Sequence, residues 1–214
     1  MSYFVTGATG FIGRYLVGNL LKRSGTVYVL VRKDSQKKFD AIAKKAGWDM
    51  KRVTVVHGDM TKPRCGLTPA QLRTLTGKVK HFFHLAAIYD LTATREAQQA
   101  ANIDGTQHAL DLAAALKAGC FHHTSSIAAA GLYPGIFRED MFDEAEGLDD
   151  PYLRTKHESE GLVRNEKRIK WRIYRPGMVV GHSKTGEIDK IDGPYYFFTL
   201  IKKLRELLPQ WVPV

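Results

Sequence analysis

The sequence predicts an α/β fold, a doubly wound parallel sheet of the Rossmann type. Two observations predict it. Short apolar, β-branched runs alternate with helical patterns along the 214 residues, as expected of parallel strands joined by helices that cover both faces of a sheet. A glycine-rich segment at residues 6–13 follows the first of these runs. The hydrophobic content of 44% suffices for one domain with a substantial core.

Six strands and five helices are expected in alternation. The expected strands are residues 4–6, 26–31, 53–57, 79–85, 120–125 and 171–174. The expected helices are residues 11–23, 35–46, 94–117, 152–163 and 194–208. Gly25 stops the first helix, and Gly119 ends the long alanine-rich one. The sequence contains no internal repeat and no linker between domains.

The segment Thr6-Gly7-Ala8-Thr9-Gly10-Phe11-Ile12-Gly13 has the spacing of a loop that wraps a pyrophosphate. Gly7 permits a tight turn, Gly10 lets the backbone approach the phosphates, and Gly13 lets the helix pack closely on the first strand. The N-terminus of that helix offers N–H groups and the positive end of its dipole. We therefore expect a dinucleotide to contact Gly7, Thr9, Gly10, Phe11, Ile12 and Gly13.

The residues after the second expected strand favour NADPH over NAD. An NAD enzyme usually places an acid there for the ribose 2′-hydroxyl, and an NADP enzyme places a base for the 2′-phosphate. This chain has Arg32 and Lys33 about 20 residues after the glycine loop, followed by Asp34. A guanidinium binds a phosphate through two hydrogen bonds. We expect NADPH as the cofactor, with Arg32 at its 2′-phosphate; a plain surface cation is the alternative.

Composition excludes several classes of protein. No apolar run approaches the length of a membrane span, and the N-terminus lacks the pattern of a signal peptide. Cys65 and Cys120 make neither a disulfide framework nor a metal cluster, so we expect a reducing, cytoplasmic location. The net charge of +10 is spread along the chain without a nucleic-acid-binding motif, so we expect no nucleic acid partner.

Two further features have alternative explanations. The expected helix at residues 194–208 combines aromatic and cationic side chains, which suits peripheral contact with a membrane. Packing against the sheet, or lining an apolar pocket, explains the same composition. The adjacent His122 and His123 would point to opposite faces of a strand, so we expect no metal site there.

Tyr152 and Lys156 are four residues apart on an expected helix, which places both side chains on one face. Asp150 is a suitable N-cap and Pro151 a suitable first residue, so the pair lies in the opening turns. Carbonyl reduction needs a proton donor for the oxygen, and a tyrosine serves when a nearby ammonium stabilises its phenolate. The fifth expected strand ends in Thr124-Ser125-Ser126, where a hydroxyl can polarise the carbonyl.

Four more motifs follow the expected strands or lie in the long helix. They are Gly58-Asp59-Met60, His84-Leu85-Ala86-Ala87, Asn102-Ile103-Asp104-Gly105-Thr106 and Arg175-Pro176-Gly177. With the glycine loop, the serine and the Tyr-Lys pair, they make the whole chain resemble an extended short-chain dehydrogenase/reductase. The resemblance implies three catalytic residues: Ser126 as the polarising hydroxyl, Tyr152 as the general acid, and Lys156, which binds the ribose hydroxyls and lowers the tyrosine pKa.

The same resemblance implies further cofactor contacts. Asp59, beside Met60, would contact the adenine. Ala86 and Ala87 would line the cofactor cleft, and the segment from Pro176 to Val179 would close over the nicotinamide.

A narrower resemblance rests on residues 122–127, 151–160 and 192–198. These stretches are similar to the N-terminal domain of bacterial alcohol-forming fatty acyl-CoA reductases, which pair an aldehyde-reducing domain with one that reduces the acyl thioester. The resemblance implies a fatty aldehyde or acyl-CoA substrate, a homodimer, and a second reductase domain that this chain lacks. It also implies that residues 1–214 bind NADP, that residues 177–214 begin the substrate-binding part, and that the sequence ends before that part is complete.

Two other functions stay open. An NAD-dependent nucleotide-sugar epimerase or dehydratase uses the same three catalytic residues, but usually has an acid where this chain has Arg32-Lys33. A non-catalytic NADP-binding module is the other alternative, and it would not need Ser126, Tyr152 and Lys156.

Overall fold

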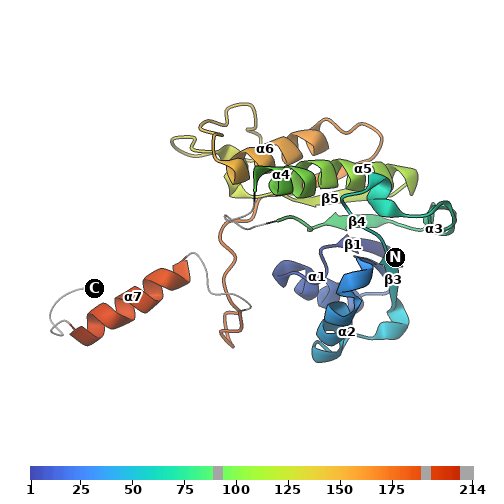
Figure 1. Ribbon diagram of the computed structural model, residues 1–214, viewed down its shortest axis with the longest axis horizontal. Coiled ribbons are helices and arrows are strands. Elements are labelled where there is room, and N and C mark those ends of the chain that lie inside the picture. Colours follow the sequence, from blue (N-terminus) through green and yellow to red (C-terminus); the bar gives the residue numbers. More distant parts are fainter. Residues whose placement is uncertain (89–93, 189–193, 208–214) are drawn as a thin grey trace. The chain divides into compact units, whose positions relative to one another are not determined.

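The computed structural model describes residues 1–88, 94–188 and 194–207 of the chain (Figure 1). It divides the chain into two compact units, Met1–Pro176 and Gly177–Val214, and each is described by itself. The second unit contains one helix, α7 (Pro194–Leu207), among its described residues. Everything below on the sheet and the candidate site concerns the first unit unless stated otherwise.

The first unit is built on six parallel strands in the order β3-β2-β1-β4-β5-β6. The strands are β1 (Ser2–Thr6), β2 (Thr26–Val31), β3 (Val53–His57), β4 (His81–His84), β5 (Cys120–Thr124) and β6 (Trp171–Tyr174). Because all strands are parallel, their carboxyl ends lie along one edge. The strand order reverses between β1 and β4, and ligands of doubly wound folds bind at such a reversal. The predicted fold class is confirmed.

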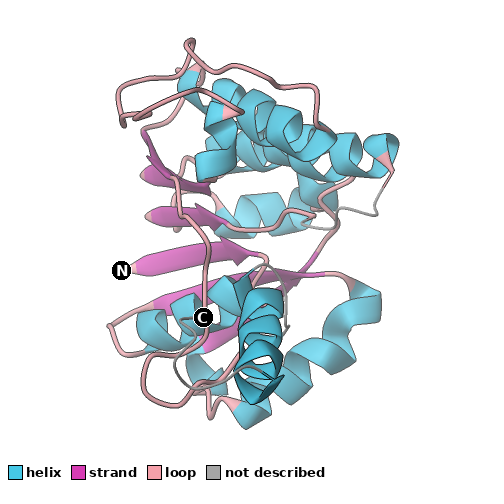
Figure 2. Cartoon of the chain, turned by 90° about the vertical axis from the view of Figure 1, so that its left-hand side faces the viewer, coloured by secondary structure: helices cyan, strands magenta, loops and turns pink. Residues whose placement is uncertain are grey.

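Helices cover the sheet on two sides, and Figure 2 shows the strands lying between the two groups. One group is α1 (Phe11–Leu21) and α2 (Gln36–Lys45), and the other is α4 (Arg95–Gln98), α5 (Gly105–Ala115) and α6 (Pro151–Arg164) (Figure 1). A short helix, α3 (Pro69–Leu75), precedes β4. The 3-10 turns are η1 (Lys33–Ser35), η2 (Met50–Arg52), η3 (Pro63–Gly66) and η5 (Ile127–Ala130).

Each face of the sheet has its own hydrophobic core because side chains alternate along each strand. On β1, Val5 packs with residues of α1 and α2, whereas Phe4 packs with residues of α5. Phe4, Phe82 and Phe121 are fully buried and stack across three neighbouring strands, with ring centroids 4.7 Å and 5.3 Å apart. This row fixes β1, β4 and β5, whose carboxyl ends lead into the glycine loop, the Ala86-Ala87 segment and Ser126.

Three strands, β2, β3 and β6, have the bounds expected from the sequence, and the fourth is shorter than expected. Two features were not expected. Helix α3 begins with a capping box in which the Thr68 hydroxyl accepts from the Gln71 N–H, and the Gln71 side chain accepts from the Thr68 N–H. The long helix expected at 94–117 contains a π-helical turn, η4 (Gln99–Asp104), between α4 and α5. Among the described helices, none is long and apolar enough to cross a bilayer.

Candidate active site

The glycine loop connects β1 to α1 in a conformation that only glycine fits at two positions. Gly7 has a φ of +74°, and a β-carbon there would lie 2.6 Å from the Ala86 nitrogen. A β-carbon on Gly13 would collide with the carbonyl of Gly7. Gly7 therefore allows the loop to pass close to the segment after β4, and Gly13 allows α1 to start directly against the loop.

The N-terminus of α1 is free of competing groups. Gly10 is its N-cap, no side chain caps the helix, and the first turn carries no acidic residue. Thr9 and Phe11 are partly exposed, and Ile12 is exposed. Since a helix N-terminus of this kind presents N–H donors to an anion, the loop fits the pyrophosphate of a dinucleotide.

Arg32 and Asp59 follow β2 and β3 at the same edge of the sheet. The exposed Arg32 side chain forms an ion pair with Asp34, Nε to Oδ1 3.6 Å. Asp59 accepts hydrogen bonds from the Thr61 N–H (3.0 Å) and hydroxyl (2.9 Å). These bonds, together with the positive charges of Lys62 and Arg32, lower the pKa of Asp59, and burial opposes them only in part. The carboxylate is therefore ionised and held in place beside the cation expected at the 2′-phosphate.

The segment after β4 is fixed by the π-helical turn. Asn102 is buried and forms two hydrogen bonds with the backbone of Ile88, accepting at 2.8 Å and donating at 3.2 Å. Its amide also donates to the Thr155 hydroxyl on α6 at 3.3 Å. Ala86 and Ala87 lie just before Ile88, and the Ala86 N–H donates to the Thr6 hydroxyl at 3.4 Å. Asn102 thus connects the expected cofactor cleft to the helix that carries Tyr152 and Lys156.

Helix α6 begins as expected, because the Asp150 carboxylate accepts from the backbone N–H groups of Tyr152 (2.8 Å) and Leu153 (3.1 Å). Tyr152 is partly buried in its first turn. Lys156 is 4% exposed, and its ammonium donates to the Thr124 carbonyl at 3.0 Å. This bond joins the Tyr-Lys helix to the end of β5, two residues before Ser126.

Burial lowers the pKa of Lys156 to about 8, although the negative charge of Glu160 raises it. The ammonium therefore prevails at neutral pH. Burial and the charge of Lys156 also lower the pKa of His84, to about 3, and that of His123. Both histidines are neutral, so Lys156 is a positive charge available to a neighbouring phenolate.

The two serines after β5 have different surroundings. Ser125 is buried, and its hydroxyl donates to Glu160 Oε2 at 2.7 Å. Ser126 is partly exposed, and its hydroxyl accepts from the Ala128 N–H at 3.1 Å as the N-cap of η5. The Ser126 hydroxyl keeps its proton for another acceptor. This difference favours Ser126 as the polarising hydroxyl, which stays a prediction.

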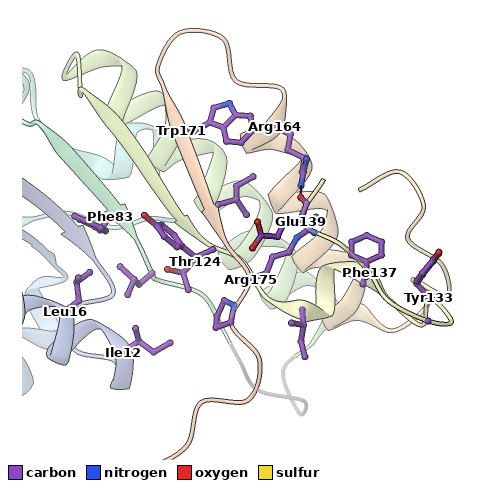
Figure 3. A pocket seen from close by; sticks show the side chains of 17 residues that line it. Ile12, Leu16, Phe83, Thr124, Tyr133, Phe137, Glu139, Arg164, Trp171 and Arg175 are labelled. Atoms are coloured by element: carbon purple, nitrogen blue, oxygen red, sulfur yellow. Dashed lines mark hydrogen bonds between the residues drawn. The ribbon is translucent and has the colours of Figure 1, made fainter. Parts of the chain in front are cut away.

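A cavity of about 1340 Å³ opens on the side of β4, β5 and β6 that faces away from α5 and α6 (Figure 3). Ile12, Thr124 and Pro176 line it near the carboxyl edge, and Tyr133 and Phe137 line it from the segment after η5. Of the predicted site residues, only Ile12 and Pro176 line this cavity; Ser126, Tyr152 and Lys156 do not. Val179 lies in the second unit, so its expected contact with the cofactor stays a prediction.

The adjacent histidines of β5 lie on opposite faces, as expected. His122 binds His81 (Nε2 to Nδ1, 3.0 Å) and the Tyr174 hydroxyl (2.9 Å), whereas His123 stacks on His84. Within the described residues, no three histidine, cysteine or acidic side chains are grouped to hold a metal ion.

The fold and this site define an NAD(P)-dependent oxidoreductase of the extended short-chain dehydrogenase/reductase type. More narrowly, the chain belongs to the male sterility protein family, an NAD-binding family whose model matches residues 5–213.

Two relatives show where such sequences occur. A linear gramicidin synthase of Brevibacillus parabrevis is 31% identical over 204 residues, which are 88% of this chain and 4% of that protein. Aldehyde reductase lnaA of Aspergillus flavus is 28% identical over 210 residues, which are 88% of this chain and 20% of that protein. The chain therefore spans a fifth or less of the length of these two relatives.

Solved structures agree on the fold. The terminal R domain from the myxalamid PKS-NRPS biosynthetic pathway matches with a TM-score of 0.75 and 31% identity, over 86% of this chain and 50% of that one. UDP-glucuronic acid 4-epimerase from Bacillus cereus, in complex with NAD, matches with a TM-score of 0.66 and 27% identity, over 85% of this chain and 58% of that one.

Proposed function

We propose that this chain is the NADPH-binding, catalytic part of a fatty acyl-CoA reductase, and that it reduces long-chain fatty aldehydes to alcohols. The observation that carries the proposal is the buried Lys156 ammonium, which lies on the same helix as Tyr152 and is anchored at the strand end that leads to Ser126. An acid, a polarising hydroxyl and a fixed cation at one strand end are the groups that carbonyl reduction needs.

NADPH, when bound, supplies the hydride to the carbonyl carbon. Ser126 donates a hydrogen bond to the carbonyl oxygen, and Tyr152 gives its phenolic proton to that oxygen as the alcohol forms. Lys156 lowers the tyrosine pKa through its charge and binds the ribose hydroxyls, which orients the cofactor. The uncapped N-terminus of α1 and the glycine loop bind the pyrophosphate.

The apolar lining of the cavity supports an aliphatic substrate. Ile127, Tyr133 and Phe137 contribute apolar surface between η5 and α6. A relative named as an aldehyde reductase supports the reaction class. Reduction of a thioester-bound acyl group is a second candidate, favoured by the match to the R domain of a PKS-NRPS pathway.

The proposed function is tested by a substrate panel with NADPH. The full polypeptide that contains this chain is mixed with NADPH and either aliphatic aldehydes of increasing length or the matching acyl-CoA thioesters, and loss of the reduced nicotinamide absorbance is followed. Oxidation with aldehydes supports the proposal, and oxidation with thioesters alone supports the second candidate. No oxidation with any member of the panel contradicts both.

The cofactor preference is tested at Arg32. Arg32→Gln removes a charge-assisted hydrogen bond worth about 1.5–3 kcal/mol, so we expect the Kd for NADPH to rise by roughly 10- to 100-fold. The Kd for NADH, which lacks the 2′-phosphate, should change less than about threefold. Lys45→Gln, at the far end of α2, removes an exposed cation as a control. Titration of cofactor fluorescence measures these constants, and equal changes for both cofactors would contradict the assignment.

The epimerase alternative predicts a different cofactor state. Epimerases of this fold usually retain NAD, and the matched epimerase structure contains it. Denaturing the purified protein and assaying the supernatant for NAD distinguishes the two functions, because a reductase that exchanges NADPH releases none. Binding of NADPH without turnover of any substrate would instead favour the non-catalytic module.

A further inference from the structure

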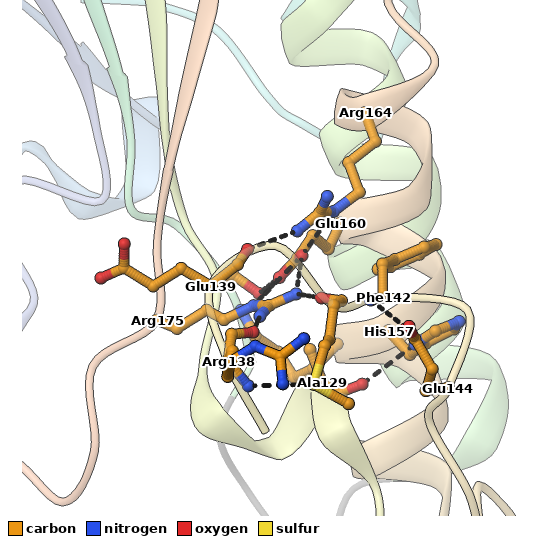
Figure 4. Close-up of polar contacts among 12 residues, drawn as sticks. Ala129, Arg138, Glu139, Phe142, Glu144, His157, Glu160, Arg164 and Arg175 are labelled. Carbon is orange, nitrogen blue, oxygen red and sulfur yellow. Dashed lines mark hydrogen bonds and ion pairs between the residues drawn. The ribbon is translucent and has the colours of Figure 1, made fainter. Parts of the chain in front are cut away.

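Glu160 is a fully buried carboxylate on α6, and three side chains donate hydrogen bonds to it (Figure 4). Its Oε1 accepts from Arg164 Nε at 2.8 Å and from Arg175 Nη2 at 2.6 Å. Its Oε2 accepts from the Ser125 hydroxyl at 2.7 Å and from Arg175 Nε at 3.1 Å. A buried carboxylate with this many partners is held in one position, because losing any of them leaves a polar group unpaired.

The partners of Glu160 come from the segments that carry the expected chemistry. Ser125 directly precedes Ser126, and Arg175 directly precedes Pro176. Glu160 itself lies one helical turn after Lys156. The backbone reinforces the arrangement, since the Ser125 N–H donates to the Tyr174 carbonyl at 2.8 Å and the Ile127 N–H to the Pro176 carbonyl at 3.1 Å. One carboxylate thus ties the ends of β5 and β6 to α6.

The same two arginines hold the segment that runs from Ser126 to Tyr152. Arg175 donates to the carbonyls of Arg138 (3.0 Å) and Met141 (2.7 Å), and Arg164 donates to the carbonyl of Glu139 (3.5 Å). One turn before Glu160 on α6, His157 stacks on Phe142 at 4.2 Å. The position of this segment therefore depends on guanidinium groups that Glu160 orients.

Glu160 is also the negative charge that acts on Lys156. The titratable groups around Lys156 are Glu160 and Tyr152 on α6, His84 on β4 and His123 on β5. The two histidines are neutral. Without Glu160, Lys156 would share its surroundings with the guanidinium groups of Arg164 and Arg175 and no compensating carboxylate. That arrangement disfavours the ammonium.

We propose that Glu160, fixed by Arg175 and Ser125, is a positioning residue for carbonyl reduction, which keeps Lys156 charged and holds Ser126 in register with Tyr152. The proposal rests on the proposed function for the reaction itself. The charge on Lys156 can be measured without turnover, so the two are tested separately.

The test is the titration of Lys156 in protein labelled with ¹³C at the lysine ε-carbons. The Lys156 resonance is assigned by its disappearance in Lys156→Met. In Glu160→Gln, which keeps the size and the hydrogen-bonding atoms of the side chain, we expect the titration midpoint to fall by about one pH unit or more. Glu160→Asp keeps the charge, and its midpoint should stay closer to that of the wild type.

Glu166→Gln is the matched control. Glu166 is also a nearly buried carboxylate paired with an arginine, Arg168, but it follows the C-terminus of α6 and lies away from the catalytic groups. Its substitution should leave the Lys156 midpoint unchanged. An unchanged midpoint in folded Glu160→Gln, or an equal shift in Glu166→Gln, overturns the proposal.

Ser125→Ala tests the second half of the proposal, and it supplies a test even where Glu160→Gln does not fold. It removes one hydroxyl without changing any charge. We expect kcat to fall by about tenfold with little change in the KM for NADPH, because Ser126 loses its register while the cofactor site is intact. An unchanged kcat overturns the positioning role, whereas an inactive wild type contradicts the proposed function instead.

Discussion

Replacing Tyr152 by phenylalanine is expected to lower kcat for aldehyde reduction by about 10²- to 10⁴-fold, the usual contribution of a general acid. The substitution removes only the hydroxyl oxygen, from a side chain in the first turn of α6. The Asp150 cap binds the backbone N–H of residue 152 and is unaffected. We therefore expect NADPH to bind with nearly unchanged affinity, so that the loss appears in kcat and not in cofactor binding.

The measurement is steady-state reduction of one aldehyde by the wild type and by Tyr152→Phe, alongside a separate binding titration with NADPH. Tyr28→Phe removes the same atom from a partly buried tyrosine on β2, outside the site, and should leave kcat unchanged. Retention of most of the activity by Tyr152→Phe would mean that another group protonates the alkoxide.

Local signals in the sequence predicted most of the first unit. The strands Thr26–Val31 and Val53–His57 have the expected bounds because β-branched runs end at polar or glycine residues. Helix α3 was missed although its signal was present, since Thr68, Pro69 and Gln71 form a capping box with proline at the first helical position.

Other features depend on contacts that the local sequence does not encode. The π-helical turn at Gln99–Asp104 lies within a pattern typical of an ordinary α-helix, and its buried Asn102 bonds to a segment 14 residues earlier in the chain. Glu160 looks like a solvated helix residue until Arg175 and Ser125 are brought to it from 15 and 35 positions away. The sequence therefore predicts the groups expected to react, but not those that hold them in place.

Replacing Lys156 by methionine should separate stability from activity. Burial lowers the pKa of Lys156 from 10.5 to about 8, so the folded chain binds this proton more weakly than the unfolded chain. Below pH 8 the charged lysine costs the fold about 3 kcal/mol, and this cost is lost as the pH rises from 8 through 10.5. Methionine binds no proton, so its stability advantage over lysine is largest at neutral pH and declines in alkali.

The magnitude at neutral pH reflects two opposing effects. Lys156→Met removes the cost of a buried charge, but it also removes the hydrogen bond to the Thr124 carbonyl, and an unpaired buried carbonyl costs about 1–3 kcal/mol. We therefore expect the variant to be between equal in stability and about 2 kcal/mol more stable at pH 7. Its activity should fall by about 10²-fold or more, because Tyr152 loses the cation that lowers its pKa.

The pH dependence identifies the cause more firmly than the value at one pH. Between pH 7 and pH 10, the difference in unfolding free energy between Lys156→Met and the wild type should decrease by about 2–3 kcal/mol. Urea unfolding at a series of pH values measures it. Lys45→Met, which replaces an exposed lysine on α2, should show a constant difference from the wild type across the same range. A constant difference for Lys156→Met as well would mean that the lysine keeps its ordinary pKa, and that its charge is not held in place at a cost to the fold.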